Sequence, residues 1–320
     1  MRESEVIERL RGIATGAAAR GLRDDVALLE GLVLTHDSIA EGVHFLPHDP
    51  PASVGWKLVA VNLSDLAAKG AEPLAALLSL TLQGDGGWEI AFIDGVAAAC
   101  ESYGLSLVGG DTISLPVNAP RVLGLTAVGR AGATTPARSG GRPGDRLWLV
   151  GTLGDSALGL AQLRADRNAT GPLIDIYRRP VPLLAAGQAL APHATAMMDV
   201  SDGLLIDAAR MAMASGCSAA IELDALPLSR AFIAERGQGL DARLFAATGG
   251  DDYALLAALP AGVAPSTLSL PQGTTIACVG SLAAGAAPLA LTSAGTPVPL
   301  PETLGHEHRG NPVPPVDDRS

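Results

Sequence analysis

Short apolar segments of strand length alternate with longer apolar segments of helix length along most of this 320-residue chain. In the first half, the pattern predicts helices over residues 3–20, 51–70 and 86–103, and strands over residues 26–29, 32–35, 74–82, 105–108 and 122–128. Such alternation is typical of domains in which helices pack on a β-sheet. We therefore expect an α/β architecture.

A polar, glycine-rich segment divides this alternation in two. Residues 134–144 read TTPARSGGRPG, which combines turn-forming residues with two arginines. After it, strands are predicted over 146–150, 196–198, 219–223, 253–256 and 275–279, with helices starting at Asp155 and Asp202 and another over 181–190. We therefore expect an α/β (α+β) chain of two domains, residues 1–137 and 138–320, with a tail that is partly mobile from about residue 300.

The charge balance limits the partners that this chain can bind. Its 22 basic and 33 acidic residues give a net charge of −11, which disfavours binding to nucleic acid and to anionic membrane surfaces. The charge-free stretch from Tyr253 to Pro301 is interrupted by prolines and glycines, so it does not predict a membrane-spanning helix. The three cysteines are far apart, and the acidic N-terminus is unlike a signal peptide. The sequence thus predicts a cytoplasmic protein without nucleic-acid or membrane partners.

Aspartates recur at the ends of the apolar segments, in the motifs DDVALL, LVLTHD, NLSD, LVGGDT, MMDVSDG and GGDDY. A single aspartate in such a place is commonly a turn former or a helix cap. Six such motifs in a chain with only 17% charged residues indicate more than capping. Carboxylates gathered in one site repel each other unless cations lie between them, and Mg²⁺ prefers oxygen ligands. The pattern therefore predicts a site for several Mg²⁺ ions and a polyphosphate.

Several common motifs of other enzyme classes are missing. Lys57 and Lys69 are the only lysines and neither follows a glycine-rich loop, so there is no Walker A motif, and G-x-G-x-x-G is also absent. Arg138, in the polar segment between the halves, is the arginine best placed to bind a phosphate chain, and a solvated linker arginine is the alternative that the sequence leaves open. His44 and His48 flank a proline, which disfavours the helix that a zinc pair with this spacing needs. No Gly-x-Ser-x-Gly motif indicates a serine hydrolase.

The order of the motifs resembles that of the thiamine-monophosphate kinases, which belong to the superfamily of aminoimidazole ribonucleotide synthetase. The matching segments extend from about residue 24 to residue 256 and include DDVALL, THDSIAEGVHF, GWKLVAVNLSDLAAKGAEP, LVGGDT, RSGGRPGD, VGTLGDSALGL, MDVSDGLLIDAAR and GGDDYALL. The combination of EGVHF, NLSDLAA and VSDGL is specific. The resemblance implies transfer of the γ-phosphoryl group of ATP to thiamine monophosphate, giving thiamine diphosphate and ADP with the help of several Mg²⁺ ions.

The resemblance also implies roles for individual residues. The implied metal ligands are Asp25, Thr35, Asp37, Asp65, Asp111, Asp199 and Asp202, the implied ATP contacts are Tyr103, Gly110, Asp111, Arg138 and Ser201, and the implied substrate contacts are His44, Asp251 and His306. It further implies a homodimer formed through the N-terminal sheet, with a C-terminal domain that closes over ATP. The nucleophile is a phosphate oxygen that is already ionised near neutral pH, so we expect no general base.

Four motifs depart from the family pattern. The usual Gly-Asp-Asp reads Arg-Asp-Asp at residues 23–25, and the common Ala-Met-Gly reads Ala-Lys-Gly at residues 68–70. A substrate-contacting glutamate is replaced by the shorter Asp251, and a C-terminal aromatic residue is replaced by His306, whose ring can still stack on a flat substrate. The last two differences bear on thiamine specificity.

Two other functions stay open on the sequence alone. One is a sibling ATP-dependent enzyme of the same superfamily with another acceptor, although EGVHF and NLSDLAAKGA resemble the kinase motifs more than those of aminoimidazole ribonucleotide synthetase. Selenophosphate synthetase and the hydrogenase-maturation relative need cysteines near the N-terminus or at the C-terminus, and residues 1–24 and the final Asp-Asp-Arg-Ser contain none. The other function is a non-catalytic nucleotide-binding regulator, which the retention of all six aspartate motifs disfavours.

Overall fold

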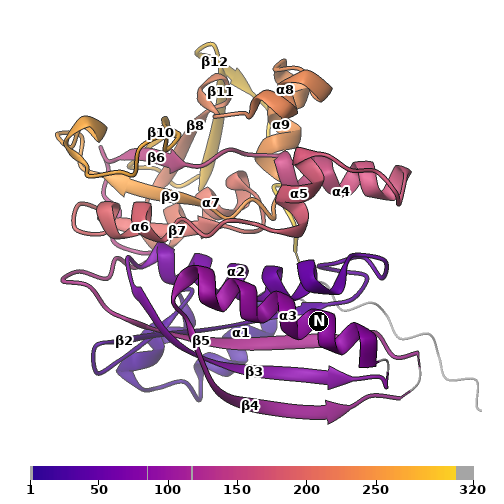
Figure 1. The fold of residues 1–320 in the computed structure, drawn as a ribbon. Helices are drawn as coiled ribbons and strands as arrows, with labels where there is room; N and C mark the ends of the chain where they lie inside the picture. The colour runs from indigo at the N-terminus through magenta and orange to yellow at the C-terminus, as the bar shows by residue number, and fades with distance from the viewer. Residues whose placement is uncertain (1–2, 85, 117, 308–320) are drawn as a thin grey trace, which may run out of the picture.

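The computed structural model describes residues 3–84, 86–116 and 118–307, which form two halves, each built on one β-sheet (Figure 1). The two sheets are mixed, and most neighbouring strands pair antiparallel. This arrangement confirms the two-domain α+β class expected from the alternation. No helix in the described part of the chain is long and apolar enough to cross a membrane. The tail was expected to be partly mobile from about residue 300; the structure describes it as far as residue 307, and its remaining residues lie outside the described part of the chain.

The first half contains a five-stranded sheet in the order β1-β2-β5-β3-β4. Its elements are α1 (Glu3–Arg11), the 3-10 helix η1 (Ala17–Leu22), β1 (Ala27–Leu29), β2 (Leu32–Ala40), α2 (Pro51–Ala68), β3 (Glu72–Leu82), α3 (Gly86–Tyr103), β4 (Ser106–Ser114) and β5 (Val122–Arg130). The prediction of one helix over residues 3–20 was wrong. The helix ends at Arg11, next to Gly12, and glycine destabilises a helix interior.

The second half contains a seven-stranded sheet in the order β12-β11-β8-β10-β6-β9-β7. Its strands are β6 (Arg146–Val150), β7 (Ala196–Val200), β8 (Ser218–Glu222), β9 (Ala254–Leu259), β10 (Ile276–Ala283), β11 (Leu289–Ser293) and β12 (Thr296–Val298). Its helices are α4 (Asp155–Ala165), α5 (Pro172–Arg178), α6 (Leu184–Leu190), α7 (Leu204–Ala214), α8 (Arg230–Arg236) and α9 (Leu240–Gly249), with the 3-10 helices η2 (Leu223–Ala225) and η3 (Pro265–Thr267).

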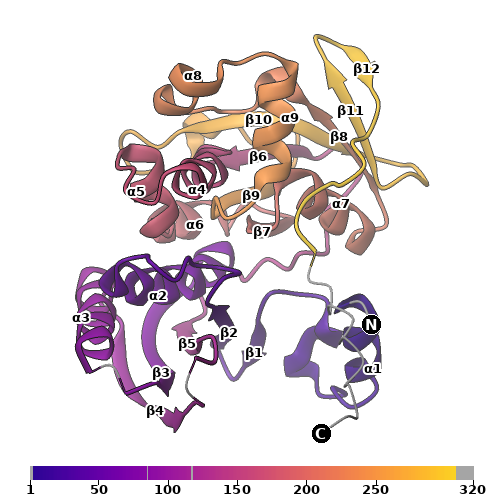
Figure 2. The same cartoon turned by 90° about the vertical axis from the view of Figure 1, so that its right-hand side faces the viewer.

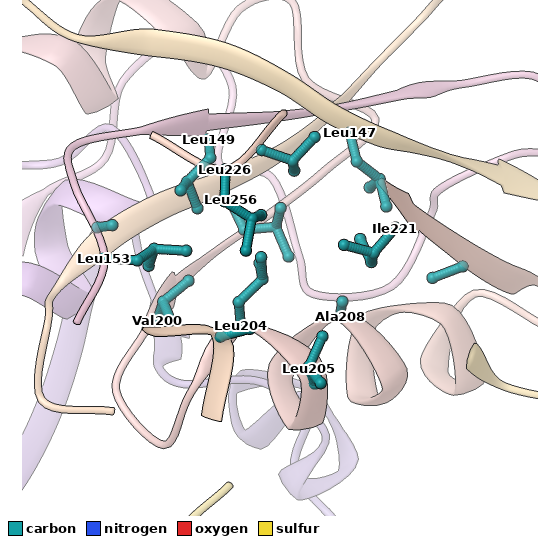
Figure 3. Close-up of a cluster of buried hydrophobic side chains, with 14 of the residues drawn as sticks. Leu147, Leu149, Leu153, Val200, Leu204, Leu205, Ala208, Ile221, Leu226 and Leu256 are labelled. Carbon is teal, nitrogen blue, oxygen red and sulfur yellow. The ribbon is translucent and has the colours of Figure 1, made fainter. Parts of the chain in front are cut away.

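Helices cover both faces of the second sheet. On one face, Leu147 and Leu149 of β6 belong to the same buried cluster as Leu204 and Leu205 of α7 (Figure 3). On the other face, α6 and the last residues of α2 pack against β6, β7 and β9. Strand β9, which lies between β6 and β7, is buried along its whole length, as expected of an inner strand with helices on both sides.

Helix α2 connects the two halves physically. Every residue from Lys57 to Ala68 is buried, because the helix packs on β2, β5 and α3 of its own half and on α6 and β7 of the other half (Figure 1, Figure 2). A helix that is apolar around most of its circumference requires such burial on all sides. Strand β7 is an edge strand of its sheet, yet all five of its residues are buried, because α2 lies against it.

The contact between the halves is close enough to require glycine. A Cβ atom at Gly187 of α6 would lie 1.9 Å from the carbonyl oxygen of Ala67. Gly70, directly after α2, has a φ of +62°, and a Cβ atom there would lie 2.4 Å from the Cβ of Ala191. The backbones of the two halves therefore meet at the C-terminal end of α2, which holds the side chains at this boundary in a defined arrangement.

Candidate active site between the two halves

Three aspartates from separate elements converge at the boundary. Asp25 precedes β1, Asp65 lies on α2, and Asp199 lies on β7. One carboxylate oxygen of each lies within 4.8 Å of the corresponding oxygens of the other two. Asp65 and Asp199 are buried, and the side chain of Asp25 is nearly so. We call Asp25, Asp65 and Asp199 the acidic cluster.

Neighbouring polar groups hold the acidic cluster in place. The hydroxyl of Ser64 donates to Asp199 Oδ2 at 2.7 Å, and the hydroxyl of Thr35 donates to Asp65 Oδ2. Thr35 and Asp37 are two residues apart on β2, so their side chains extend from the same face of the strand. The charge of Asp37 contributes to the raised pKa of Asp65, as expected of carboxylates facing one site. The structure thus places Thr35 and Asp37 beside the acidic cluster.

Burial and like charges raise the pKa values of these carboxyls. The pKa of Asp199 is raised to about 8, mainly by burial and then by the charge of Asp25. Burial, with the charge of Asp25, raises the pKa of Asp37 to about 6. The pKa of Asp65 is raised well above its usual range by burial and by the charges of Asp37 and Asp199. The site therefore has more carboxylates than its own cations balance, and its all-oxygen donors fit a hard divalent cation such as Mg²⁺.

Two cations contact Asp25. Lys69 Nζ lies 2.8 Å from Asp25 Oδ2, and Arg138 pairs with Asp25 Oδ1. Burial by itself raises the pKa of Asp25, but these two charges hold the pKa of that carboxyl below its usual range. Arg138 Nε is buried and has no hydrogen-bond partner among the described residues. An arginine with an unused buried donor beside this cluster is suited to bind an anion such as a phosphate.

Asp202 lies at the start of the loop before α7, at another side of the site. Arg210 pairs with Asp202 and also lies 2.9 Å from Asp207 Oδ1. The charge of Asp202 contributes to the raised pKa of Asp37, so the two carboxylates influence each other. The backbone N–H of His306 donates to the carbonyl of Asp202 at 2.9 Å. The structure therefore brings the predicted residues Asp202 and His306 together, although Asp202 is not a member of the acidic cluster.

A second polar group surrounds Asp251. Lys57 Nζ lies 2.6 Å from Asp251 Oδ2, the hydroxyl of Ser156 donates to the same oxygen at 3.0 Å, and the hydroxyl of Tyr253 donates to Oδ1 at 2.7 Å. Lys57 also donates to the carbonyl of His44 at 3.0 Å, which places His44 beside this group. We call Asp251 with Lys57, Ser156 and Tyr253 the Asp251 site.

The backbone of the Asp251 site adopts an uncommon conformation. Asp251 has a φ of +64° and Tyr253 a φ of +52°, in the left-handed region that favours glycine. Aspartate tolerates this region better than glutamate, because its short side chain bonds locally. The backbone N–H of Asp251 also donates to the carbonyl of Ser201 at 2.6 Å, so this turn is joined to the loop that carries Asp202. Such backbone is common at functional sites, where the surrounding structure compensates for its strain.

Asp111 and Gly110 lie away from both groups within one chain. Asp111 of β4 is opposite Ser79 of β3, which is opposite Gly124 of β5, which is opposite Ser38 of β2. Three strand spacings of roughly 4.8 Å therefore separate Asp111 from β2, a distance of about 14 Å. All nine residues of β4, including Gly110 and Asp111, are exposed. The structure thus does not bring these two predicted residues to the acidic cluster of the same chain.

The sequence interpretation missed the lysines. It noted that neither Lys57 nor Lys69 belongs to a Walker motif and that Lys69 departs from the family pattern, but it gave neither lysine a role, and each contacts a carboxylate at the boundary. The signal was available, because both lie in or next to a mostly apolar helix where an unpaired ammonium is costly. The predicted ATP contact Tyr103 lies at the end of α3 and packs edge-on against Trp56, with ring centroids 5.7 Å apart.

Comparisons with known proteins give matches over both halves of the chain. The family models described as AIR synthase related protein match residues 23–131 (N-terminal domain) and 142–262 (C-terminal domain). The chain is 38% identical to the thiamine-monophosphate kinase of Salmonella typhimurium over 309 residues, which cover 91% of this chain and 92% of the relative. It is 39% identical to that of Caulobacter vibrioides over 269 residues, covering 78% of this chain and 74% of the relative.

The fold is also shared with solved structures. A structure of AaThiL complexed with AMPPCP and TMP superposes with a TM-score of 0.83 at 32% identity, covering 96% of this chain and 97% of the other. The thiamine monophosphate kinase of Aquifex aeolicus gives a TM-score of 0.78 at 31% identity, covering 93% and 99%. The similarity therefore includes both halves of the chain and the boundary between them.

Proposed function

The chain belongs to the thiamine-monophosphate kinases, within the AIR synthase related proteins, and on this premise we propose that the acidic cluster and the Asp251 site are two parts of one active site. The enzyme transfers the γ-phosphoryl group of ATP to thiamine monophosphate and releases thiamine diphosphate and ADP. The observation that carries the proposal is the convergence of three buried carboxylates with Arg138 at the boundary. Tyr253 lies between the acidic cluster and the Asp251 site. Burial and the charge of Asp251 raise its pKa most, and the charges of Asp37 and Asp199 raise it further.

Mg²⁺ is the cation assigned to the acidic cluster. Asp25, Asp65 and Asp199 would hold it, with Thr35 and Asp37 beside them, because the donors are all oxygens and their charge exceeds that of the neighbouring cations. When bound, Mg²⁺ neutralises the charge on the transferred phosphoryl group and its neighbours. Binding also requires the carboxyls with raised pKa values to release their protons.

The chain's own groups position the two substrates. Arg138 binds the phosphate chain of ATP with its guanidinium, and Ser201 and Asp202, on the loop between β7 and α7, contribute further contacts to ATP and metal. Asp251, His44 and His306 contact the thiamine part, and Lys57 holds Asp251 in position. The attacking phosphate oxygen is ionised near neutral pH, so catalysis needs alignment and charge neutralisation and no general base.

The active form is proposed to be a homodimer that pairs through β4. This strand is at the edge of the sheet, all nine of its residues are exposed, and they include the apolar Leu107, Val108 and Ile113. An exposed apolar edge strand favours pairing with another chain. A second copy that covers β4 would also place its own Gly110 and Asp111 at the interface.

The compartment is proposed to be the cytoplasm. Cys100, Cys217 and Cys278 are all free thiols, and Cys100 and Cys217 are buried. Unpaired thiols are typical of proteins in a reducing compartment. The kinase would thus act where ATP and Mg²⁺ are both abundant.

Product analysis tests the kinase reaction. Purified protein is incubated with Mg-ATP and thiamine monophosphate, and thiamine diphosphate and ADP are quantified by chromatography. We expect equal amounts of both products, and none after addition of EDTA. ADP without thiamine diphosphate would indicate another acceptor, and products formed in EDTA would contradict the Mg²⁺ assignment.

Sedimentation analysis tests the dimer separately. Val108 of β4 is 65% exposed and Val181 of the second half is 64% exposed, which makes them a matched pair for substitution. We expect the wild-type chain and Val181→Lys to sediment as dimers and Val108→Lys as a monomer. A dimer that persists in Val108→Lys would contradict pairing through β4.

A further inference from the structure

Lys69 is one of two lysines in the chain and is the C-cap residue of α2. Its side chain is 0% exposed. Moving an ammonium group out of water is unfavourable unless acceptors and opposite charges compensate for the loss of hydration. The position at a helix C-terminus favours a cation, but this effect is small compared with the cost of burial. Specific acceptors must therefore explain why Lys69 is buried.

All three N–H donors of Lys69 have an acceptor. Lys69 Nζ donates to Asp24 Oδ1 at 2.7 Å, to Asp25 Oδ2 at 2.8 Å and to the carbonyl of Met197 at 3.0 Å. An ammonium group has three donors, so none is left for another partner. The acceptors belong to the segment before β1 and to β7 of the other half. Lys69 is thus held from both halves and cannot turn towards a ligand.

The arginines on the opposite side of the same carboxylates are held differently. Arg138 pairs with the other oxygen of Asp25, and Arg20 pairs with the other oxygen of Asp24. The side chain of Arg138 is 24% exposed and its Nε has no partner among the described residues. A phosphate chain can therefore attract Arg138 away from Asp25, whereas Lys69 stays in place.

We propose that the ammonium group of Lys69 is a permanent cation of the acidic cluster, and that it takes the place of one divalent cation, so that the chain binds one Mg²⁺ fewer than it would without this lysine. The inference rests on the Mg²⁺ assignment of the proposed function. A divalent ion and an ammonium group repel each other when both approach one carboxylate oxygen. Asp25 Oδ2, 2.8 Å from Lys69 Nζ, is therefore reserved for the lysine, and Oδ1 is left for a metal ion.

The charge of Lys69 can be removed by a substitution that keeps the length of the side chain. Methionine is close to lysine in length and carries no charge, so Lys69→Met removes the cation with little change in volume. Asp24 and Asp25 then keep their negative charges without their buried counter-ion.

Titration of metal-free protein with Mn²⁺ tests the proposal, with free Mn²⁺ measured by its electron paramagnetic resonance signal. Mn²⁺ is chosen because it prefers the same oxygen ligands as Mg²⁺. We expect Lys69→Met to bind one Mn²⁺ more per chain than the wild type. Equal numbers with equal dissociation constants would overturn the proposal. Lys57→Met is the matched control, because it removes the other buried lysine of α2 and is expected to leave the number unchanged. An equal gain in Lys57→Met would also overturn the proposal.

Two further variants keep the test decisive if Lys69→Met does not fold. Lys69→Met with Asp24→Asn removes one charge of each sign and is expected to bind the wild-type number of Mn²⁺ ions. Asp24→Asn alone keeps Lys69 and is expected to weaken Mn²⁺ binding about tenfold, the size typical of groups that contact metal ligands. A gain of one Mn²⁺ in Asp24→Asn, in which Lys69 is intact, would overturn the proposal. A wild-type chain that binds no Mn²⁺ would instead contradict the Mg²⁺ assignment, so the two failures are distinguishable.

Discussion

The acidic cluster and the Asp251 site lie at the same boundary, and α2 contributes a residue to each, yet they balance charge in opposite ways. In the acidic cluster, Lys69 and Arg138 both pair with Asp25, and neither pairs with Asp65 or Asp199; Lys69 also pairs with Asp24, which is outside the cluster. In the Asp251 site, one carboxylate has Lys57 and two hydroxyl groups to itself. The first group has an excess of negative charge, and the second is neutral.

This difference in charge balance indicates which of the two sites needs protons or bound cations for its stability. A buried excess of carboxylates is stable only when protons or added cations neutralise it. A paired carboxylate with satisfied oxygens is stable without a ligand. The acidic cluster should therefore respond to metal ions and pH, whereas the Asp251 site should respond mainly to loss of its own partners.

Asp65→Asn gives the largest expected effect. It removes a charge that would hold Mg²⁺ at the phosphates, so kcat should fall at least about 100-fold. The metal-free protein should stay folded, because the neutral amide lessens repulsion from Asp199. Steady-state kinetics and thermal unfolding measure the two effects. Asp166→Asn, an exposed aspartate after α4, is the control and should retain wild-type kcat. Full activity in Asp65→Asn would contradict the assignment of the acidic cluster.

Lys57→Met should act on stability and leave the metal dependence unchanged. It leaves Asp251 without its counter-ion, and because that side chain is 28% exposed we expect a loss of about 2 kcal/mol, below the value for a fully buried pair. Urea unfolding measures the loss. Lys57→Met with Asp251→Asn should recover part of it, because the unpaired charge is then absent. Additive losses in the double variant would show that the pair is not coupled.

The pH dependence of the metal-free protein should separate the two groups further. The folded-state pKa values of Asp37 and Asp199 are about 6 and about 8, above the ordinary value near 3.8. The folded state therefore binds more protons than the unfolded state between these limits, so its stability should fall as the pH rises from about 4 to about 8. We expect a loss of at least about 1.4 kcal/mol, the equivalent of one pKa unit.

Mg²⁺ should reverse this trend, because it replaces the protons. Chemical unfolding at pH 6 and pH 8, with Mg²⁺ or with EDTA, should show the larger stabilisation by Mg²⁺ at pH 8. The Asp65→Asn variant is the internal comparison and should show a weaker pH dependence. If the free energy of unfolding in EDTA does not depend on pH, the acidic cluster carries no excess of negative charge.

Asp251→Glu should give the smallest effect and tests whether the backbone at residue 251 requires a short side chain. Glutamate keeps the charge but must adopt the φ of +64° that aspartate tolerates better, so we expect a loss of about 1 kcal/mol. Urea unfolding measures it. Asp251→Asn also tolerates a positive φ but has no charge. Comparing the two variants therefore separates the effect of backbone strain from the effect of losing the ion pair with Lys57. A more stable Asp251→Glu would show that the turn adapts to the longer side chain.

The sequence predicted that aspartates from separate motifs lie close together, because these motifs stand at the ends of apolar segments. The aspartates of NLSD and MMDVSDG were predicted to share a site, and Asp65 and Asp199 do so. The strand positions were also predictable, because β2, β3 and β5 have clear apolar runs. The helix over residues 3–20 was mispredicted, since two glycines interrupt it, and the lysines were given no role because their carboxylate partners lie far away in the sequence.

By itself, the sequence determined the α+β class, the family and the residue types that can bind metal ions and phosphate, because these depend on local composition and motif order. Only the tertiary structure decided which of these residues meet. Asp25, Asp65 and Asp199 are far apart in the chain and come together because α2 packs against β7, while Asp111 is carried to the sheet edge by the strand order. The tertiary structure also decided the charge state of the acidic cluster, because the pKa of a carboxyl depends on burial and on neighbouring charges that only packing establishes.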